Sequence, residues 1–197
     1  MDVFPIAYFG PISYYKQYVN SPDAALEVKE HFVKQTVRTR CEILGPNGKQ
    51  ILSIPVQRVN GNKTKMDELL ILEDGWRKIH WKSIETAYSS AAYFDYYGIE
   101  VHELIFQKCA NLVEFIKEIH LRVLSWLDIE PRWNITTAYL SNYTSDYRKV
   151  AFGTQEDFVH EPYHQVFELK DTCVQNLSIL DLIFNQGPMA RKWLLDC

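Results

Sequence analysis

Residues 176–188 read Asn176-Leu177-Ser178-Ile179-Leu180-Asp181-Leu182-Ile183-Phe184-Asn185-Gln186-Gly187-Pro188. Polar residues lie inside a run that a helix serving only to pack would fill with apolar side chains. Ser178 followed three residues later by Asp181 has the form of a capping box, which predicts a helix beginning at Ile179. Gly187 is expected to end that helix, and Pro188 fits the first turn of a following helix. Asp181 would then lie in the first helical turn, where the helix dipole favours its carboxylate.

A second group of polar residues lies just upstream, in an extended segment. Tyr163 and Gln165 should project to the same side of that segment, since side chains alternate along an extended chain. Asn185 follows Asp181 by one helical turn, so these two share a helix face. We expect the four side chains to orient a sugar or amide group of a ligand. The alternative is a polar network that attaches the C-terminal helices to the rest of the fold.

The composition limits the class of protein. A chain of 197 residues that is 47% hydrophobic can bury a core, and we expect one domain over residues 1–197. The formal charge of −4 argues against nucleic-acid binding through a broad basic surface. The N-terminus has no signal-peptide pattern, and no run reaches the ~18 apolar residues of a membrane span. We therefore predict a cytoplasmic protein without stable membrane insertion, whose four scattered cysteines are free thiols.

The pattern of apolar residues and turn signals alternates between strands and helices. It predicts a single α/β domain, with a mixed sheet that contains an antiparallel hairpin and is covered by helices. Expected strands cover Val3 to Tyr8, Cys41 to Leu44, Gln50 to Val56, Leu69 to Leu72, Asn134 to Leu140 and Val166 to Leu169. Expected helices cover Ile12 to Tyr18, the segment from Asp74 to Ala91 and the segment from Asn111 to Leu127.

Two segments could hold an anion. Tyr8 and Gly10 lie where a strand ends at a helix entrance, a common place for a ligand in α/β proteins, although an ordinary turn explains them equally well. In the second segment, strand alternation would send Lys34, Thr36, Arg38 and Arg40 to one face, where they could bind a phosphate or carboxylate. The alternative is a solvated face whose cations pair with Glu27, Glu30 or Glu42.

The helix after Asp74 carries a candidate base. Trp76, His80 and Tyr88 lie on its apolar face. If His80 faces a cleft, its pKa range suits a general base. Otherwise it is a hydrogen-bonded core histidine.

One motif is misleading. His160-Glu161-Pro162-Tyr163-His164 matches the H-E-x-x-H pattern of zinc hydrolases, which requires both histidines on one helical turn. Pro162 would break that turn, at a cost of about 3 kcal/mol or more. We therefore expect no metal site, and we predict that the purified protein carries no stoichiometric zinc.

Several of these segments together resemble the WbqC-like protein family, which is found among bacterial O-antigen and other surface-polysaccharide clusters. The resemblance rests on Ala7-Tyr8-Phe9-Gly10-Pro11-Ile12, Phe32-Val33-Lys34-Gln35-Thr36-Val37-Arg38-Thr39-Arg40, Leu52-Ser53-Ile54-Pro55-Val56, Trp76-Arg77-Lys78-Ile79-His80, Pro162-Tyr163-His164-Gln165-Val166-Phe167 and the 176–188 run. Many members have His-Gln-Pro where this chain reads Pro5-Ile6-Ala7, and a glycine-rich segment that is reduced here to Phe152-Gly153-Thr154. The reaction suggested for the family is transfer of a glycyl or similar small acyl group to a sugar.

The combined interpretation is a cytoplasmic enzyme of surface-polysaccharide biosynthesis that transfers a small acyl or sugar-linked group between anionic substrates. The basic strand would hold the anion, and His80 would be the base. The set of Tyr163, Gln165, Asp181 and Asn185 would orient the acceptor, with Asp181 as the second catalytic residue. The expected partner is a small anionic molecule, either a nucleotide-sugar or an activated acyl group, and no cofactor is implied. Two alternatives stay open, a non-catalytic protein that binds a nucleotide-sugar or a partner enzyme, and a zinc metallohydrolase.

Overall fold

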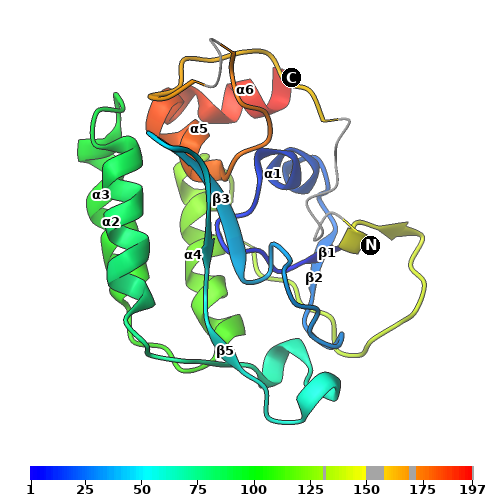
Figure 1. The fold of residues 1–197 in the computed structure, drawn as a ribbon. Helices are drawn as coiled ribbons and strands as arrows, with labels where there is room; N and C mark the ends of the chain where they lie inside the picture. The colour runs from blue at the N-terminus through cyan, green and yellow to red at the C-terminus, as the bar shows by residue number, and fades with distance from the viewer. Residues whose placement is uncertain (131, 150–157, 169–171, 197) are drawn as a thin grey trace.

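A computed structural model describes residues 1–130, 132–149, 158–168 and 172–196 (Figure 1). Its first sheet contains three parallel strands in the order β2-β1-β7, formed by Asp2–Pro5 (β1), Ala24–Glu27 (β2) and Ser145–Asp146 (β7). Helix α1, Ile12–Val19, connects β1 to β2. Parallel neighbours need such a crossover because a tight turn can join only antiparallel strands. The carboxyl ends of β1 and β2 therefore lie together at one edge of the sheet.

The predicted hairpin is confirmed. Strands β3 (Arg40–Gly45) and β4 (Gly48–Ser53) pair in antiparallel register, with Gly45 opposite Gly48. Gly48 has φ 99°, a backbone conformation that favours glycine. Two short strands, β5 (Val56–Gln57) and β6 (Leu70–Ile71), pair beyond it.

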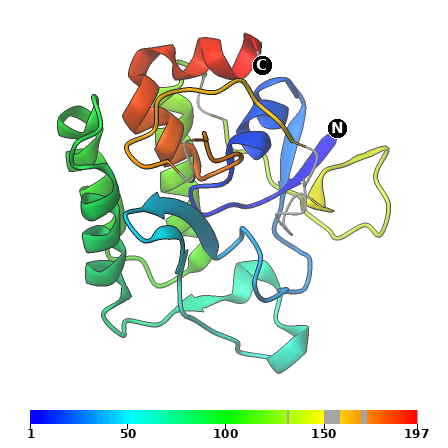
Figure 2. The same ribbon diagram turned by 45° about the horizontal axis from the view of Figure 1, so that its top comes forward.

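The helices pack around these sheets (Figures 1 and 2). They are α2 (Trp76–Tyr88), α3 (Phe94–Phe106), α4 (Leu112–Trp126), α5 (Ile179–Gln186) and α6 (Ala190–Asp196). In both views, the β3–β4 hairpin lies between the α2–α3 pair and the β1–β2 sheet. The buried apolar side chains form one main cluster and a small second cluster of Leu44, Val174 and Leu177. The α/β class and the mixed pairing predicted from the sequence are confirmed.

Two of the predicted helix starts, those of α4 and α5, follow from their caps. The side chain of Asn111 accepts hydrogen bonds from the backbone N–H groups of Val113 (2.9 Å) and Glu114 (3.2 Å), and α4 follows. Ser178 accepts from the N–H of Leu180 at 3.3 Å, and α5 begins at Ile179 as expected. Gly187 ends α5 with φ 52°, and a Cβ there would approach the Tyr93 ring to 2.5 Å.

Three expected strands are wrong. Residues 34–39 form bends and a turn, and Gln35 has φ 63°, which breaks the alternation expected of that segment. Residues 134–140 make only the isolated bridge Leu26↔Ile135, because the segment leaves the sheet after one pairing. Residues 166–168 are irregular, while Leu169 lies outside the described residues. The sequence patterns also assigned no element to α3.

In the described part of the chain, no helix is long and apolar enough to cross a membrane. Cys41, Cys109 and Cys173 are free thiols, as predicted, and Cys197 lies outside the described residues.

Candidate functional site

The predicted residues Tyr8, Trp76 and His80 are brought together at the first turns of α2. The Tyr8 hydroxyl lies 2.9 Å from Nδ1 of His80. The Trp76 ring crosses the imidazole edge-on, with 4.8 Å between their centroids. Only 3% of His80 is exposed, yet it lines a pocket of about 290 Å³. His80 therefore meets both the apolar core and a cavity, which residue exposure alone does not reveal.

The pocket lies between β4 and the start of α2. Its wall combines apolar side chains with polar ones, formed by Gln50, Ile51, Leu52, Ser53, Pro55, Asp74, Trp76, Ile79 and His80. The carboxylate of Asp74 accepts the N–H of Trp76 at 3.3 Å, which orients the first turn of α2. Gln50, Ser53 and Asp74 were not predicted to belong to a site. No sequence pattern marked these three as site residues. They line the pocket because the fold brings β4 and the start of α2 together beside His80.

The imidazole of His80 is neutral near pH 7. Burial lowers its pKa to about 4, and the nearby Arg77 acts in the same direction. A backbone hydrogen bond with Ser53 and the charge of Asp74 oppose this shift. A backbone group that raises a histidine pKa accepts a ring N–H, so the imidazole has the Ser53 backbone and the Tyr8 hydroxyl as its two partners. These two partners fix the orientation of the imidazole.

The turn at Gly10 is closed by the chain itself. The first N–H groups of α1 bind the Leu177 carbonyl (2.9 Å, from Ile12) and the Asn176 side chain (3.0 Å, from Ser13). A Cβ on Gly10 would lie 2.9 Å from that of Ala7, so close packing requires the glycine. The ordinary turn therefore explains Gly10, and the helix entrance has no spare donors there for an anion.

The basic segment does not present a common face. Arg38 is 1% exposed and binds Glu30 through Nε (2.7 Å) and Nη2 (2.5 Å), while Lys34 is exposed. Thr36 donates its hydroxyl to the Val33 carbonyl at 3.1 Å. Arg40 is half-buried at the start of β3. The paired alternative therefore describes Arg38. Its Nη1 is buried and has no hydrogen-bond partner among the described residues.

A second buried carboxylate lies close enough to Glu30 to affect its pKa, at the carboxyl end of β2. Glu27 is fully buried and accepts hydrogen bonds from the hydroxyls of Thr136 (2.7 Å) and Tyr143 (3.2 Å). Nη1 of Arg148 lies 3.8 Å from it. Burial raises the pKa of Glu30, against the lowering effect of Arg38. Sequence reasoning missed this cluster because its members come from segments more than a hundred residues apart.

The predicted group around Asp181 forms a closed network. Asp181 is 1% exposed, and its Oδ1 accepts from the Tyr163 hydroxyl (2.6 Å) and from Nε2 of Gln165 (3.1 Å). Gln165 also binds the backbone of Val174 through both ends of its amide, at 2.7 and 3.0 Å. Burial raises the pKa of Asp181, and its hydrogen bonds oppose that shift. The shared side of Tyr163 and Gln165 is as expected, while exposed His164 points the other way.

Tyr88 and Asn185 join this network only at its edge. The Tyr88 hydroxyl is buried near Asp181, and within the described residues no partner meets normal hydrogen-bond geometry. Asn185 donates to the backbone carbonyl of Asp181 at 2.8 Å, and not to its carboxylate. The polar-network alternative thus accounts for these contacts.

The H-E-x-x-H segment is not helical. Residues 158–165 have irregular backbone, as the proline argument required. His160 is buried and makes contacts with Glu161, Tyr163 and Trp193. The described residues contain no group of three side chains suited to a metal ion. The zinc content itself stays a prediction.

The fold and these contacts describe an α/β protein with a small polar-edged pocket beside a neutral histidine. The model of the WbqC-like protein family matches residues 7–157, and the chain belongs to that family. Uncharacterized protein Rv1507c of Mycobacterium tuberculosis is 31% identical over 219 residues, covering 96% of this chain and 92% of that protein. No solved structure matches the chain. The family match includes Tyr8, Arg38 and His80 and ends before the Asp181 network.

Proposed function

We propose that this protein is a cytoplasmic transferase of surface-polysaccharide biosynthesis, which moves a small acyl group, such as a glycyl group, or a sugar-linked group between anionic substrates. The observation that carries the proposal is the position of His80 on the wall of a pocket, with its ring neutral and held by Tyr8. The resemblance to the WbqC-like family supplies the pathway. The pocket supplies the place where an acceptor hydroxyl or amine could meet a base.

The low pKa of His80 determines how such a base would work. With a pKa of about 4, the free imidazole is a weak proton acceptor at pH 7. A negative charge beside the ring would favour the imidazolium and raise that pKa. An anionic donor bound next to the acceptor would therefore strengthen the base at the moment when proton transfer is needed. This links the predicted anionic substrate to the predicted role of His80.

Arg38 is the proposed contact for that anion, with exposed Lys34, buried Thr36 and half-buried Arg40 as its neighbours in the segment. The carbonyl of Val37 accepts the N–H of Tyr8 at 2.9 Å, so the turn that carries Arg38 contacts the residue that holds His80. The unpartnered Nη1 gives Arg38 one guanidinium nitrogen for a phosphate or carboxylate. Asp181, Tyr163, Gln165 and Asn185 act as positioning residues in this proposal, because their network meets α2 at Tyr88.

One observation favours a non-catalytic protein that binds a nucleotide-sugar. The His80 ring already has Tyr8 and the Ser53 backbone as partners, so a ligand could bind in the pocket without any proton transfer. A substitution at His80 separates the two functions, because a structural or binding residue and a base respond differently.

The experiment compares His80→Gln with His120→Gln. His120 is a matched control because it is also buried, and burial lowers its pKa to about 3, but it lines none of the pockets described here. Transfer of a glycyl group from an activated donor to nucleotide-sugars and oligosaccharides would be measured, together with thermal unfolding. We expect His80→Gln to lose turnover by ~10²-fold or more with a similar fold. His120→Gln should lose stability alone. Equal turnover in wild type and His80→Gln would contradict the proposal that the protein is an enzyme with His80 as its base.

A further inference from the structure

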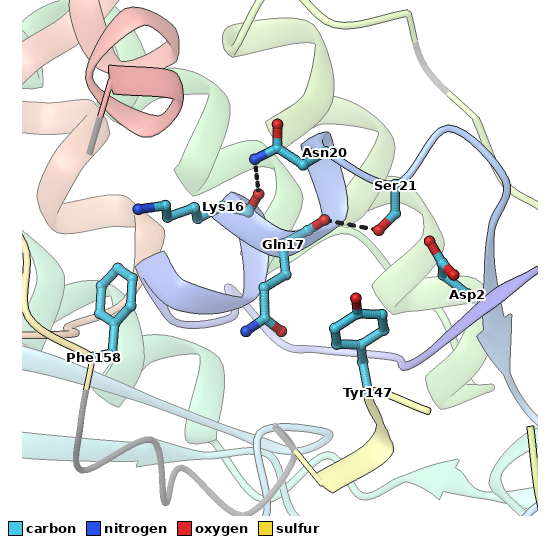
Figure 3. Close-up of a pocket in the computed structure, with 7 residues that line it drawn as sticks. All are labelled: Asp2, Lys16, Gln17, Asn20, Ser21, Tyr147 and Phe158. Carbon is cyan, nitrogen blue, oxygen red and sulfur yellow. Dashed lines mark hydrogen bonds between the residues drawn. The ribbon is translucent and has the colours of Figure 1, made fainter. Parts of the chain in front are cut away.

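A second pocket, separate from the His80 pocket, lies against α1 (Figure 3). It has a volume of about 330 Å³, at the small end of the roughly 300–1,000 Å³ range of ligand pockets. Its lining comes from α1 and the two residues after it, the first residue of β1 and the segments after β7, namely Asp2, Lys16, Gln17, Asn20, Ser21, Tyr147 and Phe158. The two pockets share no residue.

Two of the polar side chains in this lining belong to the end of α1. Asn20 donates to the Lys16 carbonyl at 2.8 Å, and Ser21 donates to the Gln17 carbonyl at 3.0 Å. They satisfy the last carbonyls of the helix, as a helix end requires. The ammonium of Lys16 lies over the Phe158 ring, 5.7 Å from its centroid. The other polar groups in the lining that can contact a ligand are the carboxylate of Asp2, the amide of Gln17 and the hydroxyl of Tyr147.

Gln17 gives the strongest sign of a ligand. Figure 3 shows its amide extending from α1 between Phe158 and Tyr147. Its Oε1 is buried, and within the described parts of the chain it accepts no hydrogen bond. A buried acceptor without a donor costs stability, and a bound hydroxyl would remove that cost.

The other lining residues indicate the charge and the chemical class of the ligand. One carboxylate and one ammonium make the wall neutral overall, which favours an uncharged molecule. Tyr147 is held rigidly, because its ring stacks on Phe4 with 4.5 Å between centroids and 7° between planes. Phe158 supplies a second ring. Aromatic walls with an amide, a carboxylate and a hydroxyl suit a molecule that has both C–H faces and many hydroxyls.

We propose that this pocket binds one neutral saccharide unit. Gln17 and Asp2 hydrogen-bond to its hydroxyls, and Tyr147 and Phe158 flank its ring. The site holds a sugar outside the His80 pocket, so it serves to retain a glycan and not to react with it. The proposal does not depend on the transfer reaction.

The test uses the full chain and four neutral sugars, glucose, galactose, rhamnose and N-acetylglucosamine, observed through backbone NMR shifts. At least one sugar should shift the signals of residues 16–21 and of Tyr147, with a Kd of about 1 mM or below. Signals that respond only around β4 and α2, or no response to any sugar at about 50 mM, would overturn the proposal.

Variants then locate the contact. Gln17→Ala should weaken binding by about fivefold or more, since one hydrogen bond is lost. Gln107→Ala removes an exposed amide elsewhere and should leave affinity unchanged. Tyr147→Phe removes only the hydroxyl and keeps the stacking on Phe4, so it tests the site even if Gln17→Ala proves unstable. His80→Gln should bind the sugar normally here. Equal affinity in wild type, Gln17→Ala and Tyr147→Phe would show that the sugar does not bind in this pocket.

Discussion

His80 and Asp181 occupy similar positions in their helices, but His80 lines a pocket and Asp181 lies in a closed network. Each is a polar residue on the buried face of a helix, and each has a tyrosine partner, Tyr8 at 2.9 Å and Tyr163 at 2.6 Å. Their exposed fractions, 3% and 1%, barely differ. However, α2 packs beside the largely exposed strand β4, which leaves a pocket at His80. Tyr163 and Gln165 lie against Asp181 and supply its hydrogen-bond donors. The exposed fraction of a residue therefore does not distinguish a candidate site from a structural network. The elements that pack beside the residue do distinguish them.

Among the polar residues in closed environments, Arg38 should contribute most to the stability of the fold. Arg38→Ala leaves Glu30 buried without its partner, and we expect a loss of about 3–5 kcal/mol in the free energy of unfolding. Arg40→Ala, at a half-buried position only two residues away, should change it by about 0.5 kcal/mol or less. Urea unfolding measures both. Similar losses in the two variants would show that the Arg38–Glu30 pair is not the cause.

The same pair tests the anion site through a variant that keeps Arg38. Glu30→Gln frees the guanidinium from its carboxylate, so it should bind nucleotide-sugars more tightly than wild type in calorimetry. Unchanged or weaker binding would place the anion elsewhere.

The Asp181 network should show an intermediate effect. Asp181→Ala leaves the Tyr163 hydroxyl and one Gln165 N–H contact without an acceptor, and we expect a loss of about 3 kcal/mol. Asn185→Ala, one turn further on the same helix, loses a single bond to a backbone carbonyl and should cost about 1 kcal/mol. If Asp181→Ala loses no more than Asn185→Ala, the network does not stabilise the fold as its contacts indicate.

The pH dependence of stability should distinguish the two regions more finely, because their pKa values shift in opposite senses. The pKa of His80 is lowered from 6.5 to about 4, so its contribution is fully present above pH 6.5 and is lost as pH falls through about 4. At 1.36 kcal/mol per unit of pKa, this amounts to roughly 3 kcal/mol. The pKa of Asp181 is raised above 3.8, so its contribution is present at low pH and decreases as pH rises.

Urea unfolding between pH 4 and pH 8 measures these slopes in wild type, His80→Gln and Asp181→Asn. His80→Gln should lose less stability than wild type as pH falls below about 6.5. Asp181→Asn should lose less than wild type as pH rises from 4. Identical slopes in all three proteins would mean that neither group is buried in solution as it is in the structure.

Local patterns were sufficient to predict much of the fold. The caps at Asn111 and Ser178, the glycine stop at Gly187 and the turn between β3 and β4 each depend on a few neighbouring residues, and each is present. The strand expected over residues 34–40 was wrong because Gln35 adopts a positive φ, which alternation of residue types does not reveal. The strand expected at 134–140 was wrong because a strand needs partners along its length, and the partners are chosen by the whole fold.

The sequence by itself determined the α/β class, the starts of α4 and α5, the grouping of Tyr163, Gln165 and Asp181, and the non-helical H-E-x-x-H segment. These follow from backbone geometry and spacing, which act over a few residues. Only the tertiary structure decided that Arg38 pairs with Glu30, that Glu27 collects hydroxyls from Thr136 and Tyr143, and that His80 reaches a pocket. Burial, desolvation and cavity shape arise when segments distant in the sequence pack together, so no local pattern encodes them.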